Sequence, residues 1–416
     1  MEGRCMMKDT KCNILVLTSL YPADDIPKSD TPVVHYFTKE WVKKGCNVQV
    51  VHFAYNLPKW AFWIIRTFPR LVSKCWGGVL RTKSVDDREY CLDGVPVRRF
   101  PLKKNKARGR YKHSQIEELY NKCIEYLTEK DFKPDVIISH WSNPQLEIMS
   151  MLKSYYQVPT VYVAHNRGAE IEIAYGLDAS LFLKSIDLIG FRSGAIENEF
   201  RARFNYDGPG FRCNSGIPVQ FVNQEIPQRD FSETNCFIYV GTFIKRKYAD
   251  AIIPSVKSAM GESSYTITFI GRGNEEKTIR RQVKNENVIN KVKLLGYVPR
   301  EEVNRQLKSN DVFIMISKGE TFGLVYLEAM STGCITIASK GEGMDGVIKH
   351  GVNGFLCTAG DVEELTSLIR DIRNMPKEKL KEISKCAVST ARELTDKKVA
   401  EDYLTNIQNL LTKQDN

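Results

Sequence analysis

The stretch DVFIMISKGETFGLVYLEAMSTGCITIAS, residues 311–339, decides the fold. An apolar run over residues 311–317 is followed by a short loop, then by an apolar segment of helix length that ends at Gly333, and then by a second apolar run. Runs this apolar are typical of parallel strands whose two faces are both covered by helices. The stretch therefore predicts a strand, loop, helix and strand of a doubly wound α/β fold.

The same alternation recurs along the whole chain. Short apolar runs separated by segments of helical periodicity include NILVLTSL, NVQVVHF, PDVIISH, TVYVAHN, CFIYVG, YTITFIG and KVKLLGYV. The chain has 416 residues, whereas a single core usually stops growing at about 250–300 residues. Periodicity is lost in residues 214–235, which are rich in Pro, Asn and Gln. We therefore predict two Rossmann-like domains, residues 1–217 and 218–395, that face each other across a cleft, and a final helix over residues 396–416 that can cross back to the first domain.

Composition and charge limit the class of protein. Hydrophobic residues make up 42% and charged residues 26%, which is ordinary for a folded protein and unlike a disordered one. The 11 cysteines include no C-x-x-C pair, and the sequence shows neither a signal peptide nor a run of about 20 apolar residues. We therefore expect reduced thiols and a cytoplasmic protein.

The loop and helix that follow residue 317 predict an anion site. A helix that begins near Gly323, at the carboxyl end of a strand, directs free N–H groups and a positive dipole end into the cleft. Glu320 and Glu328 lie eight residues apart, which is up to about 12 Å along a helix, so that one ligand could touch both. Carboxylates accept paired hydrogen bonds from sugar hydroxyls. From spacing alone, two unrelated surface charges remain the alternative.

A basic cluster supplies the opposite charge. Lys245, Arg246 and Lys247 follow a strand that ends at Gly241, where they would neutralise a pyrophosphate, although a run of three basic residues is by itself more often a solvated loop. A nicotinamide or flavin site is disfavoured, since the G-x-G of FIGRGNEE lacks the third glycine of a dinucleotide fingerprint. The chain contains no D-x-D triplet for a divalent metal, so we expect a site that works without a metal ion.

Taken together, these segments resemble the family 4 glycosyltransferases, which are retaining enzymes of the GT-B fold. The similarity runs in order over nearly the whole chain, through PDVIISHW, VPTVYVAHNRG, NSGIP, VGTFIKRK, FIGRGNE, LLGYVPREEV, ETFGLVYLEAMSTG and GVIKHGVNGFL. The E-x7-E element from Glu320 to Glu328 is its most specific part. The sequence looks most like members that build capsular or O-antigen repeat units.

The resemblance implies a role for each matching position. Glu320 would face the transferred sugar and Glu328 the ribose of the nucleotide. His165, at the end of TVYVAHN, would reach the donor sugar near the bond that breaks. The backbone around Phe322, Gly323 and Leu324 would hold the pyrophosphate together with the side chain of Lys247. Gly241 and Thr242 would also take part in binding the donor.

Two positions depart from the family pattern, and one more residue is a candidate. Thr242 stands where many members have an arginine, so that Arg246 or Lys245 would supply that charge. The first loop lacks the usual glycine and has Thr31 in its turn, which leaves contact with the donor there open. His140 also ends a predicted strand near the cleft, although a histidine beside a tryptophan is more often structural.

The resemblance thus implies a metal-independent, hexosyltransferase-type enzyme that needs no cofactor. It would move a sugar from a nucleotide-diphosphate sugar, a UDP- or GDP-sugar, to a saccharide acceptor with retention of configuration. A sugar-nucleotide epimerase or a phosphorylase on the same fold, and a non-catalytic protein that binds nucleotide sugars as a partner of another transferase, are the alternatives.

A basic and aromatic segment, residues 56–81, predicts a further contact. It interleaves tryptophans such as Trp60 and Trp63 with basic residues and is divided by Pro69 into two pieces that suit a membrane interface but are too short to span a bilayer. The net charge of +10 is concentrated here, since residues 59–112 hold 15 Lys and Arg against 4 Asp and Glu. We expect a lipid-linked acceptor on the inner face of the cytoplasmic membrane. Packing of these aromatic residues into the first domain is the alternative, and nucleic acid is not expected as a partner.

Overall fold

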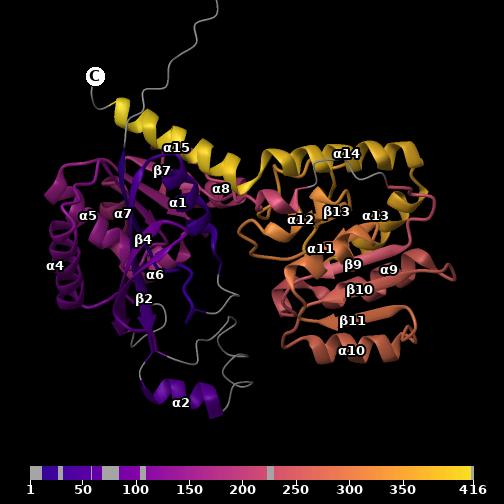
Figure 1. The fold of residues 1–416 in the computed structure, drawn as a ribbon. Coiled ribbons are helices and arrows are strands. Elements are labelled where there is room, and N and C mark those ends of the chain that lie inside the picture. Colours follow the sequence, from indigo (N-terminus) through magenta and orange to yellow (C-terminus); the bar gives the residue numbers. More distant parts are fainter. Residues whose placement is uncertain are drawn as a thin grey trace, which may run out of the picture.

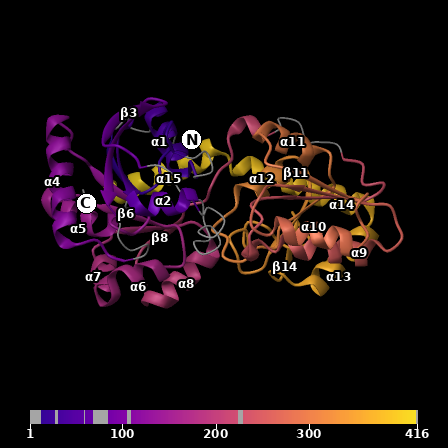
Figure 2. The ribbon, with the colours of Figure 1, turned by 90° about the horizontal axis from the view of Figure 1, so that it is seen from below.

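Two separate sheets organise the chain (Figure 1). The computed structural model describes residues 12–26, 31–57, 59–67, 84–103, 109–222 and 229–413. The first sheet has the strand order β3-β4-β2-β1-β5-β6-β7-β8, and the second has the order β11-β10-β9-β12-β13-β14. Figure 2 shows the two domains side by side, with α4 and α5 at the outer end of the first and α9 and α13 at the outer end of the second. The predicted doubly wound α/β class is confirmed.

The first domain is built from strands and helices that alternate along the chain. Its strands are β1 Asn13–Thr18, β2 Asn47–Asn56, β3 Arg88–Leu92, β4 Val95–Lys103, β5 Val136–His140, β6 Thr160–Ala164, β7 Leu188–Phe191 and β8 Gly210–Arg212. Its helices are α1 Val33–Lys43, α2 Lys59–Thr67, α4 His113–Glu129, α5 Gln145–Tyr156, α6 Ala169–Tyr175, α7 Ala179–Lys184 and α8 Gly194–Phe204. Neighbouring strands pair in parallel, except that β3 and β4 form an antiparallel hairpin at one edge.

The second domain repeats the pattern in a wholly parallel sheet. Its strands are β9 Cys236–Val240, β10 Thr266–Ile270, β11 Val292–Gly296, β12 Val312–Ile314, β13 Ile335–Ser339 and β14 Phe355–Cys357. Its helices are α9 Ile252–Met260, α10 Glu276–Asn285, α11 Arg300–Lys308, α12 Leu324–Ser331, α13 Val362–Asn374 and α14 Lys377–Glu393. Residues 311–339 thus contain β12, a loop, α12 and β13.

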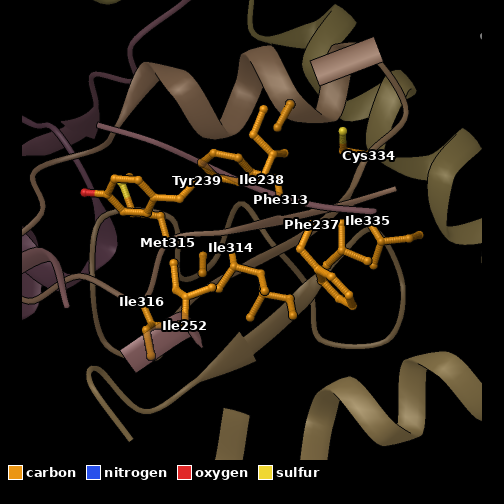
Figure 3. Close-up of a cluster of buried hydrophobic side chains, with 14 of the residues drawn as sticks. Phe237, Ile238, Tyr239, Ile252, Phe313, Ile314, Met315, Ile316, Cys334 and Ile335 are labelled. Carbon is orange, nitrogen blue, oxygen red and sulfur yellow. The ribbon is translucent and has the colours of Figure 1, made fainter. Parts of the chain in front are cut away.

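The apolar runs are buried because helices cover both faces of each sheet. One apolar core surrounds the second sheet, and Figure 3 shows part of it, where Phe237 and Phe313 lie among aliphatic side chains of neighbouring strands. The first sheet has a core on each of its two faces. Burial on both faces explains why these strands lack the polar alternation of a half-exposed strand.

The last helix, α15 Asp396–Thr412, lies on the first domain although it follows the second in sequence (Figure 1). Its apolar side chains join the core that also contains Trp41 of α1. The indole Nε1–H of Trp41 donates a hydrogen bond to the carbonyl of Ala400 over 2.9 Å. Lys39 of α1 and Lys44, which directly follows α1, form ion pairs with acidic residues of α15. Packing of this helix therefore ties the end of the chain to the first domain.

The basic and aromatic segment is only partly described. Residues 59–67 form α2, which lies beyond the carboxyl end of β2 at one end of the first domain (Figure 1). Trp60 and Trp63 are exposed, whereas Ile65 is buried. Residues 68–81 lie outside the described residues. None of the described helices is long and apolar enough to cross a membrane.

Candidate active site

A cavity of about 800 Å³ separates the two domains at the carboxyl ends of their strands. Open α/β sheets bind ligands at this edge. Side chains of both domains line it, and ten of the predicted site residues are among them: Thr31, His165, Gly241, Thr242, Lys247, Glu320, Phe322, Gly323, Leu324 and Glu328. The fold therefore gathers at one site residues that lie as far apart in sequence as Thr31 and Glu328.

Helix α12 points its N-terminus into the cavity. Gly323 caps this end with a φ of 85° and a ψ of 83°, and a Cβ atom there would come within 2.6 Å of the ring of Tyr326. Only glycine fits both the left-handed backbone and this close approach. The Tyr326 hydroxyl donates to the carbonyl of Met315, which fixes the ring against the strand segment before the loop. The helix end thus has free N–H groups and a partial positive charge at the cavity wall, where an anion would bind.

Two cations hold Glu320 at the cavity. Its carboxylate lies 3.4 Å from Lys247 Nζ and 3.6 Å from Arg246 Nη1, and its side chain is 14% exposed. The backbone N–H of Glu320 donates to Glu342 over 3.1 Å. Lys247 also lines the cavity, whereas Arg246 reaches Glu320 from outside the lining. This arrangement places a carboxylate and an ammonium group side by side near the N-terminus of α12.

Glu328 has a different environment. It is buried within α12 and bound by the guanidinium group of Arg300, whose Nε lies 2.9 Å from Glu328 Oε1. Arg300 begins α11 and also donates to the hydroxyl of Tyr36 in the first domain over 3.3 Å. Burial raises the pKa of the Glu328 carboxyl, and the charge of Arg300 opposes that rise. Arg300 was not among the predicted site residues, because nothing in its local sequence marks it as a partner of the second glutamate.

His165 faces the cavity from the first domain. Its ring stacks on Trp141 with 4.0 Å between centroids and an interplanar angle of 10°. Its Nε2 lies 2.9 Å from Nδ1 of His140, and its carbonyl accepts a hydrogen bond from Thr321 of the second domain. Burial, together with His140 and the positive charge of Arg192, lowers the pKa of His165 well below its usual value. His165 is therefore a neutral imidazole near neutral pH.

A second link between the domains was also missed. Arg167, just after β6, lies with its Nη2 2.9 Å from Glu342 and 3.1 Å from the carbonyl of Gly341. Its Nη1 lies 3.0 Å from Glu199. Since Glu342 also accepts the N–H of Glu320, Arg167 supports the loop that carries the first glutamate. Such a pair joins residues 175 positions apart and has no signature in either local sequence.

Three predicted residues do not line the cavity. Lys245 is exposed at the start of the basic turn, and Arg246 only touches the edge of the site through Glu320. His140 is fully buried behind His165. Within the described part of the chain, no group of three or more His, Cys, Asp and Glu residues is arranged to hold a metal ion.

Part of the chain is similar to a known protein family. Residues 222–388 match the family model for glycosyl transferases group 1. Over 138 residues the chain is 31% identical to an N-acetyl-alpha-D-glucosaminyl L-malate synthase of Bacillus anthracis, an alignment that covers 32% of this chain and 36% of the relative. Over 111 residues it is 30% identical to the amylovoran biosynthesis glycosyltransferase AmsK of Erwinia amylovora, covering 25% of this chain and 27% of the relative. The chain thus aligns with only about a quarter to a third of the length of these two relatives.

The fold comparison extends over both domains. A crystal structure of Anabaena Alr3699/HepE in complex with UDP superposes with a TM-score of 0.67 at 18% sequence identity, covering 95% of this chain and all of that one. Because the superposition covers 95% of this chain, it extends over both sheets and agrees with the architecture described above. The chain therefore has the GT-B fold, and most of its second domain matches the family model for glycosyl transferases group 1.

Proposed function

We propose that the protein is a retaining glycosyltransferase that moves a sugar from a nucleotide-diphosphate sugar to a hydroxyl group of a saccharide acceptor. The observation that carries the proposal is the arrangement of Glu320, Lys247 and the N-terminus of α12 at one wall of a cavity whose opposite wall holds His165. A diphosphate fits the positive wall, and a sugar attached to it would lie between Glu320 and His165.

The charges of the site support a mechanism based on stabilising the leaving group. As the bond between the anomeric carbon and the phosphate oxygen breaks, negative charge grows on the diphosphate. Lys247 and the N–H groups of α12 would stabilise this charge because they are already in place before the reaction. The acceptor oxygen would attack from the face that the diphosphate leaves, and its proton would pass to the departing phosphate oxygen. This route retains the configuration and assigns no enzyme side chain as nucleophile.

UDP-sugars are the donors that we propose first. The Anabaena protein has been crystallised with UDP and with UDP-glucose. In this chain we propose that Glu328, which lines the cavity from within α12, accepts hydrogen bonds from the ribose hydroxyls of the nucleotide. A thermal-shift panel of UDP-, GDP- and ADP-sugars tests this choice, because a ligand that binds only the folded protein raises the melting temperature. A shift with a GDP-sugar alone would reject UDP. Addition of EDTA during turnover tests the proposed independence from metal ions.

Glu320 gives the sharpest test of the reaction. In Glu320→Ala we expect transfer of the sugar to be lost, while the thermal shift caused by the nucleotide remains, because Lys247 and the end of α12 still hold the diphosphate. Glu378→Ala, which removes a carboxylate from a remote helix of the second domain, is the matched control. Near-normal turnover by Glu320→Ala would reject the assignment. A wild-type protein that binds the donor but never turns it over would instead favour the non-catalytic alternative.

We further propose that the acceptor is lipid-linked and that the protein works in surface polysaccharide synthesis on the inner face of the cytoplasmic membrane. Trp60 and Trp63 of α2 are 65% and 64% exposed, which suits an interfacial helix. The similarity to a glycosyltransferase of amylovoran biosynthesis supports the same setting.

Flotation with vesicles tests the membrane contact. We expect binding to vesicles that contain anionic lipid, weaker binding at high salt, and loss of binding in Trp63→Glu. The control is Ile289→Glu, which adds the same charge at an apolar residue that is 63% exposed in the second domain. Vesicle binding that is equally strong in both variants, or absent from the wild-type protein, would reject the membrane proposal. Neither result would bear on the proposed sugar transfer.

A further inference from the structure

His140 and His165 form a buried pair of imidazoles behind the cavity. His140 ends β5 and is fully buried, and its ring stacks on Phe37 with 6.1 Å between centroids. Its Nδ1 lies 2.9 Å from His165 Nε2. If both rings are neutral, one of these two nitrogens carries a proton and donates it in a hydrogen bond to the other. Trp141 packs flat on the other side of His165 and fixes the plane of that ring. The pair can therefore hold one of two tautomeric arrangements.

The unpartnered atom of His140 distinguishes the two arrangements. Among the described residues, no hydrogen-bond partner reaches its buried Nε2. If His165 donated to His140, the proton of neutral His140 would lie on this Nε2 and leave a buried N–H without an acceptor. If His140 donates from Nδ1, its Nε2 is a bare acceptor instead. The nearby positive charge of Arg192, which lowers the pKa of both rings, favours a lone pair over an N–H dipole at His140.

We infer that His140 is a positioning residue that donates its Nδ1 proton to His165 and so fixes His165 as the Nδ1–H tautomer. The ring nitrogen of His165 that is not used by His140 is then a hydrogen-bond donor. It follows that His165 offers a proton to an oxygen of the bound donor and does not accept one as a base. This inference deepens the proposed function and rests on it only for the identity of the ligand.

The tautomer can be measured without any substrate. The experiment is a long-range ¹H–¹⁵N correlation spectrum of the full-length protein labelled with ¹⁵N in its six histidines. The signals of His165 are assigned by their loss in His165→Gln. We expect a protonated Nδ1 and an unprotonated Nε2 at His165. A protonated Nε2, or an average between the two tautomers, would overturn the inference.

Variants of His140 test what the tautomer does. The amide nitrogen of asparagine reaches about as far as Nδ1 of histidine, whereas that of glutamine reaches about as far as Nε2. We therefore expect His140→Asn to keep kcat within about threefold, and His140→Gln and His140→Leu to lower kcat about tenfold or more with little change in the KM for the donor. The His165 spectrum of each variant reports in parallel whether the Nδ1–H tautomer persists.

The outcomes separate this inference from the proposed function. If the wild-type protein turns over no nucleotide sugar but His165 has the expected tautomer, the proposed function fails and the inference about the pair stands. If the protein is active but His140→Leu keeps both full activity and the tautomer, His140 has no positioning role. If His140→Asn and His140→Gln lose activity equally, the effect is a general loss of packing, and the inference is again rejected.

Discussion

Glu320 and Glu328 belong to one sequence element, yet the protein treats their charges differently. Glu320 touches two cations from the loop after β9 and remains at the cavity wall. Glu328 is buried and depends on a single partner, Arg300. A buried carboxylate that keeps its charge needs a partner, because the protein interior disfavours an isolated ion. Arg300 therefore favours the ionised form of Glu328 and opposes the rise in its pKa that burial causes.

Removal of Arg300 should make the stability of the protein fall as pH rises. In Arg300→Ala the pKa of Glu328, already raised by burial from its ordinary 4.5, should rise further. Below that ordinary value the carboxyl is protonated in the folded and unfolded states, so the variant loses little stability on this account. As pH rises through the folded pKa, the variant must bury an unpaired carboxylate, and its free energy of unfolding should fall by about 2 kcal/mol relative to wild type.

Urea unfolding at several pH values measures this difference. The double variant Arg300→Ala with Glu328→Gln is the control, since it has no carboxyl at position 328 to ionise. Its free energy of unfolding should not fall further below that of the wild type as pH rises. A loss in Arg300→Ala that is the same at every pH would mean that Arg300 acts through its packing on Phe221, over which its guanidinium lies at 4.3 Å, and not through charge.

Residues of the site divide clearly into those that sequence could predict and those that it could not. Glu320, Gly323 and His165 occur in local patterns that end at a strand or begin a helix, so their place at the cavity follows from the fold. Arg300 and Arg167 contribute through partners 28 and 175 residues away. The partner of Arg300 depends on how α11 packs against α12, and the partner of Arg167 depends on how the two domains meet. No local pattern specifies either.

At the scale of elements, continuous burial made several strands recognisable. β12 and β13 are buried along their whole length and read as apolar runs. The hairpin of β3 and β4 was missed because β3 alternates between half-buried and exposed residues, and because β4 contains two arginines and two prolines. β8 has only three residues, too few to show a pattern. These three strands lie at or next to the ends of the first sheet.

The junction between the loop and α12 gives a prediction at this scale. In Gly323→Ala a Cβ atom would meet Tyr326 and would also strain a backbone with φ of 85°. Strain in the left-handed region costs about 1–2 kcal/mol, and displacement of the tyrosine should tilt the N–H groups that face the diphosphate. We therefore expect a lower melting temperature together with a loss of about tenfold or more in UDP affinity, measured by thermal shift and calorimetry.

Gly351→Ala is the matched control for backbone strain. Gly351 has a similar φ of 74° but open space where the Cβ would lie, and it does not line the cavity. This variant should lose stability and keep its affinity for UDP. Equal losses of affinity in the two variants would show that the effect of Gly323→Ala is global and that the end of α12 has no special part in nucleotide binding.

At the scale of the whole molecule, polar contacts cross the cavity at several points. Thr321 donates to the carbonyl of His165, Arg300 reaches Tyr36, and Arg167 pairs with Glu342. Each contact joins an element of the first domain to one that carries site residues in the second. The relative position of the domains is thus coupled to the geometry of the site, so a change in one contact should alter both.

Arg167→Ala tests this coupling. Glu342 would lose its cation and hold the N–H of Glu320 less firmly, so amide hydrogen exchange in the loop of residues 318–323 should become faster. We expect kcat/KM for the donor to fall about tenfold, which corresponds to about 1.4 kcal/mol of transition-state stabilisation. Arg203→Ala is the control, because Arg203 also pairs with Glu199 but makes its other ion pair with Glu172, within the first domain. If both variants lost activity equally without faster exchange in the loop, the effect would come from the first domain alone, and Arg167 would not couple the domains to the site.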